Sequence, residues 1–465
     1  MLWVSLPGKP QDTNLVQKLL HEKTLEGASW SVMVRRCSDG QVLLAHNEKL
    51  RLLPASVQKI LISFAALELL GPSHTFFSDF YLQEHFSGNG VWEGALVVDV
   101  RQNPAFGTPG LTSPSVDSLT ALLTAEFKNR GAQRVALQVV PLLRRHTMSL
   151  LPEAWYVEDL AFRYGTPPQP FVYKENQAEL KITWNGDQPL PVFNGRERTP
   201  EWLKTDILVD RSARRGGQWE GSLQWQNGRL YWRLALRIKP GDTAVFQIPN
   251  PRPECAFFED LASGIEQRLG IGQFEGELHY ETDPFALQAP WLRMESLSLD
   301  RLDSVINHQS HNFYSEMLLW NLFDTETDYD GKLEALKKFW EERVGPGLRL
   351  RDASGLSRSN WMTADWMTRC LMYIYSSPLF PAFYLTLPQW GLSGTLKNLG
   401  NPKDAARGCA RAKSGSMQGV QGYAGFLNTA RHGTLCFAFF FNHFSGPASD
   451  IQKLCTRLLN EFCKP

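Results

Sequence analysis

The sequence lacks several features that would mark a membrane, nucleic-acid-binding or secreted precursor protein. No apolar run approaches the 18 or so residues that a membrane-spanning helix needs. Lys plus Arg and Asp plus Glu both number 48, so the basic excess of a nucleic-acid-binding surface is missing. The start MLWVSLPGKPQD has no basic region followed by an apolar one, so no signal peptide is visible. Either the protein is cytoplasmic, or it is an exported protein in its mature form.

Cysteine is also scarce and scattered. Seven cysteines in 465 residues are too few for a disulfide scaffold, and their odd number leaves at least one thiol free. None forms a Cys-x-x-Cys pair, which argues against a structural zinc site. Cys436 lies in the apolar run LCFAFFF and is expected to be buried packing material.

The remaining composition is that of an ordinary globular protein. Hydrophobic residues make up 43% and charged residues 21%, which excludes disorder and fibrous folds. The length favours two or three domains. Fifteen Trp and 27 Phe either fill cores or line clefts, and core filling is the expected role of most of them.

Strand-like runs occur near both ends of the chain, and helical patterns accompany them. The expected strands are 30–35, 41–45, 424–430 and 434–441, and the expected helices are 14–23, 56–70, 311–323, 332–344, 363–376 and 450–462. We expect one sheet built from the two ends, with the middle inserted into it. The middle contains a clear hairpin signal at Asn227-Gly228, and its basic cluster Arg211 to Arg215 is expected to be a solvated loop.

The first candidate motif opens the apolar helix at 56–70. Ser56 and Lys59 are three residues apart, so a helix places the amine beside the hydroxyl. A serine needs a neighbour to take its proton before it becomes a good nucleophile, and burial lowers a lysine pKa enough for that role. Alone, the motif is weak, and a helix start with an N-terminal serine and a surface lysine is the favoured explanation.

Two more candidate motifs follow in the C-terminal half. Ser310 and Asn312 flank one position at the start of a helix, where they either face a cleft or simply cap the helix. Lys413-Ser414-Gly415-Ser416 precedes a strand-like run, and either offers a cation and a hydroxyl to a substrate carboxylate or forms a polar turn. The glycine allows close approach of a substrate backbone.

Together the three motifs are far more specific than each alone. The order Ser-x-x-Lys, Ser-x-Asn, Lys-Ser/Thr-Gly resembles the active-site set of penicillin-binding proteins and serine β-lactamases. The segments that begin at Asp352 (DASGLSR), Ser310 (SHNFYSEML) and Leu387 (LPQWGLSGTL) resemble those of class C low-molecular-mass penicillin-binding proteins. These are D-alanyl-D-alanine carboxypeptidase/endopeptidases of the penicillin-binding protein 4 type.

The chain departs from the pattern of that family at four points. Ser414 replaces the usual Thr and keeps the hydroxyl, and Ala353 replaces a usual glycine. His311, in the middle of the second motif, is expected to point outward into solvent. Asn103-Pro-Ala-Phe-Gly107 stands where the family has a Gly-Gly-Asp-Pro-like segment.

The resemblance implies an α/β (α+β) fold with a serine β-lactamase/transpeptidase-like domain and large β-rich insertion domains between the first and second motifs. The 254 residues from Ser56 to Ser310 make room for that insertion. The expected catalytic domain is discontinuous, at 1–72 and 290–465, and the inserted region at 73–289 is expected to form two subdomains.

The resemblance also implies the reaction and the roles of the residues. The expected reaction is hydrolysis of D-Ala-D-Ala bonds, or of D-configured cross-links, in peptidoglycan stem peptides through a Ser56 acyl-enzyme, which β-lactams would trap covalently. The expected catalytic residues are Ser56, Lys59, Ser310, Asn312 and Lys413. The expected substrate-binding residues are Ser414, Gly415, Ser416, Ser354, Leu356 and Arg358.

The resemblance implies neither a cofactor nor a metal. It implies a periplasmic or otherwise extracytoplasmic protein, with the signal peptide absent from this chain. Two other classes of function remain open. A β-lactamase or esterase would use the same nucleophile but release the acyl group rapidly. A non-catalytic peptidoglycan-binding scaffold would keep the fold and form no acyl-enzyme.

If Lys59 is the base, Lys59→Arg will abolish acylation by benzylpenicillin, because arginine stays charged at every accessible pH. Loss of a general base typically lowers the rate about 10²–10⁴-fold. Intact-protein mass spectrometry over time measures the adduct. Near-normal acylation of the variant would refute the role of Lys59.

Overall fold

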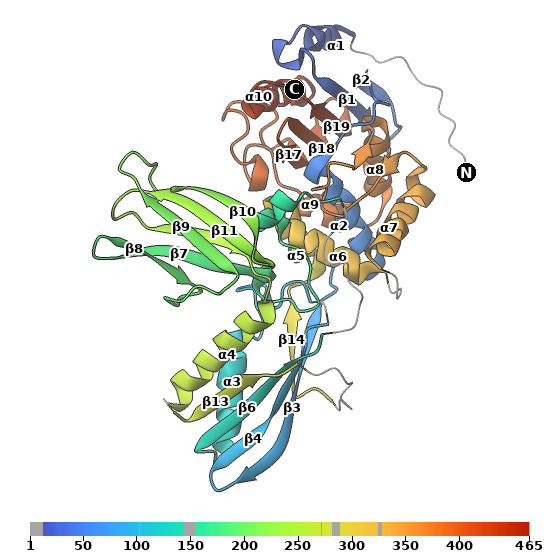
Figure 1. The fold of residues 1–465 in the computed structure, drawn as a ribbon. Coiled ribbons are helices and arrows are strands. Elements are labelled where there is room, and N and C mark those ends of the chain that lie inside the picture. Colours follow the sequence, from blue (N-terminus) through green and yellow to red (C-terminus); the bar gives the residue numbers. More distant parts are fainter. Residues whose placement is uncertain are drawn as a thin grey trace. The chain divides into compact units, whose positions relative to one another are not determined.

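The computed structural model describes residues 13–101, 103–143, 152, 154–270, 272–280, 289–323 and 328–464 (Figure 1). The chain divides into two compact units. The first unit comprises residues 1–74, 152–155 and 298–465, and the second comprises residues 75–151 and 156–297. Each unit has its own sheets and its own core.

The first unit contains a five-stranded antiparallel sheet that joins the two ends of the chain. Its order is β17 (Ala410–Met417), β18 (Val420–Thr429), β19 (Gly433–Asn442), β1 (Ser29–Arg36) and β2 (Val42–His46). Trp30 pairs with Phe441 and Arg35 with Cys436 across the β1–β19 ladder. The expectation of one sheet built from both ends is therefore confirmed.

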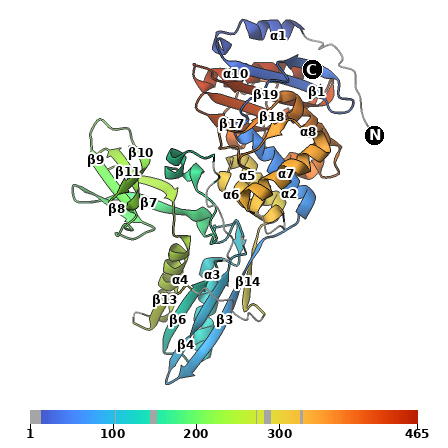
Figure 2. The same ribbon diagram turned by 45° about the vertical axis from the view of Figure 1, so that its right-hand side comes forward.

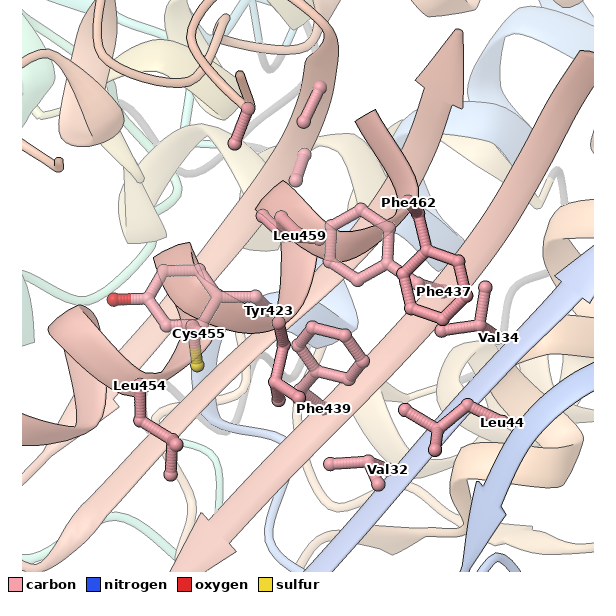
Figure 3. Close-up of a cluster of buried hydrophobic side chains, with 14 of the residues drawn as sticks. Val32, Val34, Leu44, Tyr423, Phe437, Phe439, Leu454, Cys455, Leu459 and Phe462 are labelled. Carbon is pink, nitrogen blue, oxygen red and sulfur yellow. The ribbon is translucent and has the colours of Figure 1, made fainter. Parts of the chain in front are cut away.

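Helices cover both faces of this sheet (Figure 2). On one face lie α1 (Thr13–Leu20) and α10 (Ala448–Cys463), whose apolar sides share a core with β1, β2, β18 and β19. Figure 3 shows Phe437 and Phe439 of β19 among Leu454, Leu459 and Phe462 of α10. The other face of β19 packs against α8 (Ala364–Ser376), where Cys436 Sγ lies 3.5 Å from the Thr368 carbonyl. Because both faces are covered, β19 is a continuous apolar run, and Cys436 is buried as expected.

A cluster of helices surrounds α2 (Lys59–Leu70), which is buried over most of its length. Its neighbours include α5 (Leu299–Gln309), α6 (Asn312–Leu322), α7 (Tyr329–Val344) and α9 (Phe380–Thr386). Phe64 packs edge-on against Phe383, and Trp340 Nε1 donates to the Leu61 carbonyl at 3.2 Å. A helix that is apolar on all sides, as α2 is, needs such a surround to be stable.

A two-stranded ladder, β15 (Leu348–Arg349) with β16 (Trp361–Met362), completes the first unit. The loop between these strands carries residues 350–360.

The second unit has one mixed sheet flanked by two helices. Its strand order is β13 (Phe274–Leu278), β6 (Arg134–Pro141), β4 (Val91–Asp99), β3 (Phe77–Gly88), β14 (Leu292–Ser296) and β5 (Thr112–Ser113), and its helices are α3 (Val116–Asn129) and α4 (Pro253–Leu269). The atypical Asn103 is buried here; its side chain donates to Ser78 Oγ and accepts from the Ala105 N–H, so it shapes a turn.

Two three-stranded sheets share a further core of the second unit. They are β10 (Gln218–Gln226), β11 (Arg229–Ile238) and β9 (Leu203–Val209), and β12 (Ala244–Pro249), β7 (Gln177–Asn185) and β8 (Gln188–Phe193). The hairpin predicted at Asn227-Gly228 joins β10 to β11, with Gln226 opposite Arg229. The basic cluster at 211–215 forms an exposed turn, apart from buried Ala213. Among the described residues, no helix is both long and apolar enough to cross a membrane.

One disulfide, Cys409–Cys463, ties the start of β17 to the end of α10. The spacing of the cysteines did not predict this pair. The bond closes a loop over a sequence separation of 54 residues, and such a crosslink restricts the unfolded chain.

Replacing Cys409 and Cys463 together by alanine is expected to destabilise the first unit by about 2–4 kcal/mol. Thermal unfolding followed by circular dichroism measures the change. Cys255→Ala, which removes a half-buried thiol of the second unit, is the matched control. Equal melting temperatures for the double variant and the wild type would contradict a stabilising crosslink.

Candidate active site

The candidate nucleophile Ser56 lies in a short 3-10 helix, Ala55–Gln58, that leads into α2. The helix predicted from residue 56 therefore begins as a 3-10 turn. Ala55 adopts a left-handed conformation with φ 48°, which turns the chain sharply from Pro54 into the helix. One turn later, Lys59 Nζ donates to Ser56 Oγ at 3.0 Å.

The amine of Lys59 is fully buried and surrounded by oxygen atoms. Besides Ser56 Oγ, it contacts Asn312 Oδ1 and the Ser354 carbonyl, each at 2.6 Å. Burial lowers the pKa of Lys59 to about 7, against the opposing charges of Asp352 and Glu316. A neutral amine has two N–H groups, which can donate to Asn312 Oδ1 and to the Ser354 carbonyl. Its lone pair then faces the Ser56 hydroxyl.

A tight junction between α5 and α6 positions Ser310 and Asn312. Ser310 ends α5 in a left-handed conformation with φ 57°, and Asn312 is the first residue of α6. Asn312 reaches Lys59, while Ser310 Oγ accepts from Lys413 Nζ at 2.9 Å. His311 occupies the N-cap position of α6 and its side chain makes no capping bond, so the simple capping interpretation of this motif is not supported.

The expectation that His311 points into solvent is wrong. Only 7% of the residue is exposed, and its ring stacks on Tyr314 at a centroid distance of 4.3 Å. His311 immediately precedes α6, and its ring lies over Tyr314 in the first turn of that helix. The aromatic contact accounts for the burial.

The third motif lies on β17, which is the edge strand of the sheet. Lys413 is fully buried; its Nζ donates to Ser310 Oγ and to the Ser414 carbonyl at 2.7 Å. Burial, followed by the charge of Lys59, lowers the pKa of Lys413 well below its usual range. Ser414 Oγ bonds to Thr395 Oγ1 at 2.7 Å, and Ser416 is exposed.

Gly415 permits a close approach between β17 and the nucleophile. A Cβ at this position would lie 2.5 Å from the Pro54 carbonyl oxygen and 2.9 Å from the Ser56 nitrogen. No side chain fits in that space. The glycine therefore lets the edge strand run beside the start of the nucleophile helix.

Two buried carboxylates hold the loop that supports Lys59. Glu316 Oε1 accepts from the Ser354 N–H at 2.8 Å, and Oε2 accepts from Tyr329 Oη at 2.7 Å. The Ser354 carbonyl is the group that contacts Lys59. Glu316 thus anchors the same residue whose oxygen faces the amine.

Asp352 is the centre of this loop. Its carboxylate accepts from three successive backbone N–H groups, at residues 355, 356 and 357, over 2.8–3.0 Å. It also accepts from Asn360 Nδ2 at 2.7 Å and from Trp155 Nε1 at 2.9 Å. These donors fix the orientation of the Asp352 carboxylate and hold the 355–357 backbone around it.

The two carboxylates also act on each other. Burial, and then the charge of Asp352, raise the pKa of Glu316 to about 7. Lys59, Glu316 and Asp352 are all fully buried. The charge state of the base is therefore set by a competition between burial and these two acids.

The structure brings Ser56, Lys59, Asn312 and Ser354 into one cluster, with Ser310 and Lys413 bonded to each other beside it. Leu356 and Arg358 lie farther along the loop, and Arg358 lines a cavity of about 340 Å³.

Sequence reasoning assigned no role to four residues that support this site, namely Glu316, Asp352, Trp155 and Thr395. Glu316, Asp352 and Thr395 lie inside the segments that resemble the family, and that resemblance could have identified them. No pattern in the sequence points to Trp155. Among the described residues, no group of three or more His, Cys, Asp or Glu side chains could hold a metal ion.

The profile of one peptidase family matches residues 12–214 and 254–461, which is most of the sequence. The chain belongs to the D-Ala-D-Ala carboxypeptidase 3 (S13) family. This match confirms the predicted family and the class of enzyme, a serine-type D-Ala-D-Ala carboxypeptidase, and the sheets and helices described above confirm the α/β fold class.

Curated relatives match over nearly the whole chain of this S13 protein. A D-alanyl-D-alanine carboxypeptidase of Actinomadura sp. is 25% identical over 93% of this chain and 81% of its own. The carboxypeptidase DacB of Haemophilus influenzae is 24% identical over 94% of this chain and 90% of its own. The coverage leaves no large part of the S13 chain without a counterpart in these relatives.

The fold is also that of a solved relative. The crystal structure of penicillin binding protein 4 from H. influenzae superimposes with a TM-score of 0.77, at 20% identity, over 97% of this chain and all of that one. A second structure of that protein, in complex with a β-lactam, gives a TM-score of 0.71 over the same share of each chain, at 21% identity.

The contact network predicts how the pH dependence of acylation responds to Glu316. If the neutral amine of Lys59 is the base, acylation should rise with pH through the Lys59 pKa of about 7 and then level off. The negative charge of Glu316 raises that pKa, so Glu316→Gln should shift the rising limb to lower pH. Stopped-flow acylation by a chromogenic β-lactam between pH 5 and 9 measures the limb.

Glu342→Gln, which removes an exposed carboxylate of α7, is the control and should leave the limb in place. A limb that stays in place, or moves to higher pH, in Glu316→Gln would show that this carboxylate does not tune the base.

Proposed function

We propose that this enzyme hydrolyses peptidoglycan stem peptides at D-Ala-D-Ala or D-configured cross-link bonds through an acyl-enzyme on Ser56. One observation carries the proposal: a fully buried amine, with its pKa lowered to about 7, lies 3.0 Å from the Ser56 hydroxyl. A base in this state accepts a proton at neutral pH without first having to lose one.

In the first step, Lys59 Nζ takes the Ser56 proton as Ser56 Oγ bonds to the substrate carbonyl carbon. The backbone N–H groups of Ser56 and Ser416 would stabilise the oxyanion, and one such donor typically contributes about 3–4 kcal/mol. The close approach of β17 at Gly415 to the Ser56 nitrogen supports this pairing.

In the second step, the C–N bond breaks and the leaving amine receives a proton from Ser310, which recovers one from Lys413. The 2.9 Å contact between Ser310 Oγ and Lys413 Nζ supports this relay. Water then attacks the acyl carbonyl carbon, and the ester bond breaks. One water proton goes to Ser56 Oγ and the rest of the water forms the carboxylic acid. The proton that Lys59 took in the first step passes to Lys413, which returns both amines to their starting states.

Substrate would be held on both sides of the scissile bond. Asn312 would bind the peptide backbone, and Ser414 would bind the terminal carboxylate of the leaving D-Ala, where Thr395 orients the hydroxyl. Ser354, Leu356 and Arg358 would line the pocket for the residue on the acyl side. A carboxypeptidase and an endopeptidase share these contacts and differ in the size of the leaving group that the site must accept.

The proposed substrate places the enzyme outside the cytoplasmic membrane. Peptidoglycan peptides are cross-linked and trimmed there. The disulfide Cys409–Cys463 supports an oxidising compartment, because such bonds form mainly in exported proteins.

Ser56→Ala should abolish both turnover and the covalent benzylpenicillin adduct, with thermal stability nearly unchanged, because the variant removes only the attacking oxygen. Intact-protein mass spectrometry over time, with wild type in parallel, measures the adduct. A stable adduct on the wild type alone supports the proposal.

Other outcomes point to the competing functions. Rapid loss of the drug without an accumulating adduct would indicate a β-lactamase. Neither adduct nor drug loss would favour a non-catalytic scaffold, and an adduct on Ser56→Ala would refute the nucleophile.

A further inference from the structure

A cavity of about 650 Å³ in the second unit combines aromatic rings with charged side chains. It is formed by the end of β8, the loop to β9, the start of β11 and the first turns of α4. Pockets that bind small molecules typically have volumes of about 300–1,000 Å³. Four arginines and two glutamates line this cavity, and its aromatic residues are Phe193, Trp202, Tyr231 and Trp232. None of these residues belongs to the three motifs.

The aromatic rings are held by contacts with their neighbours. Trp202 meets Trp232 edge-on, with a centroid distance of 5.9 Å, and Trp232 Nε1 donates to the Leu160 carbonyl at 3.0 Å. Lys204, which does not line the cavity, places its amine 4.1 Å from the centre of the Tyr231 ring. A ligand would therefore meet rings that are already oriented, which lowers the entropic cost of binding.

The charged side chains supply both donors and acceptors beside these rings. Arg196 forms an ion pair with Glu259, and Arg229 lies 3.9 Å from Glu201. Arg198 is exposed and forms no ion pair with any residue that the structure describes. Guanidinium groups only donate hydrogen bonds, whereas carboxylates only accept them. The cavity can therefore bind a ligand whose polar groups do both.

A saccharide chain matches this combination. A sugar ring has an apolar C–H face that packs against an aromatic ring, and hydroxyl and acetamido groups at its edge that donate and accept. A nucleic acid is disfavoured, because the two glutamates would repel its phosphates and the protein has no net positive charge. An apolar peptide is disfavoured, because it would bury the charged groups without offering them hydrogen-bond partners.

We propose that this cavity binds the glycan strand of peptidoglycan, with sugar rings packed against Trp202 and Tyr231 and with hydrogen bonds from Arg198. The inference rests on the proposed function, which names peptidoglycan as the substrate, because stem peptides are carried on a chain of N-acetylated amino sugars. It goes beyond that function, because it assigns to the second unit the binding of the polymer whose peptides are hydrolysed.

The test measures binding of a sugar that carries no peptide to the full-length wild-type enzyme. The probe is a tetrasaccharide of alternating N-acetylglucosamine and N-acetylmuramic acid, and isothermal titration calorimetry gives its dissociation constant. Maltotetraose, which has four sugar rings but neither acetamido nor carboxyl groups, is the comparison. The amino-sugar tetrasaccharide is expected to bind about tenfold more tightly, because hydrogen bonds to a charged group contribute that much. Equal affinities, or no binding of either sugar, would overturn the proposal.

Two substitutions locate the binding in the cavity. Tyr231→Ala and Arg198→Gln should each weaken binding of the amino-sugar tetrasaccharide about tenfold, as truncation of a central contact does. Tyr164→Ala and Arg215→Gln are the matched controls, because they remove an exposed tyrosine and an exposed arginine of the second unit that do not line the cavity. Circular dichroism is expected to report the same fold for all four variants. Unchanged affinity in the two cavity variants, or an equal loss in the controls, would contradict a glycan site here.

Further measurements separate this site from a peptide site and from the proposed chemistry. A free stem peptide is expected not to compete with the tetrasaccharide, and competition would identify a peptide site instead of a glycan site. The benzylpenicillin adduct is expected to form equally on the wild type and on both cavity variants, because the drug carries no sugar. Absence of the adduct from the wild type would count against the Ser56 chemistry, while the affinities for the two sugars would still decide the glycan site.

Discussion

The chemistry proposed for this enzyme depends on the burial of one amine. Lys59 lies without solvent contact between Ser56 Oγ, Asn312 Oδ1 and the Ser354 carbonyl. Burial disfavours the charged form of a lysine, while the acceptors and the nearby acids favour it. The balance, a pKa of about 7, leaves a large share of the amine neutral under ordinary conditions. Any change that admits water to this pocket would favour a charged lysine, which could not act as the base in the proposed mechanism.

Maintaining that pocket requires an unusual amount of buried polarity. The Asp352 carboxylate accepts from three backbone N–H groups and from side chains that include Asn360 and Trp155, and Glu316 accepts from the Ser354 N–H. Buried polar networks are stable only when their members are satisfied, and they then fix a single geometry. The hydrogen-bonded 352–357 loop therefore fixes the position of the Ser354 carbonyl that contacts Lys59, and the proposed mechanism depends on that position.

How well the sequence predicted each interaction depends on how far apart in the chain its residues lie. The Ser56–Lys59 contact follows from helical spacing, and the strands 434–441 and 30–35 were visible as apolar runs. That these strands share one sheet followed from the strand-like runs near the two ends of the chain, and the class of enzyme followed from the three motifs in order. The burial of His311 and the Asp352–Trp155 bond depend on packing between distant segments, which no local pattern encodes. The Cys409–Cys463 bond was hidden for the same reason, because seven cysteines allow many pairings.

The construction of the central sheet has a consequence for biosynthesis. Leu53, just ahead of the nucleophile, bonds with Asn442, which lies 389 residues later in the chain, and β1 pairs with β19 along its whole length. During translation Ser56 is made well before β17, which carries Lys413, and before β18 and β19, which hold β17 in the sheet. A nascent chain that stops short of β17 therefore carries Ser56 without Lys413. The proposed hydrolytic activity can arise only after synthesis has passed β19.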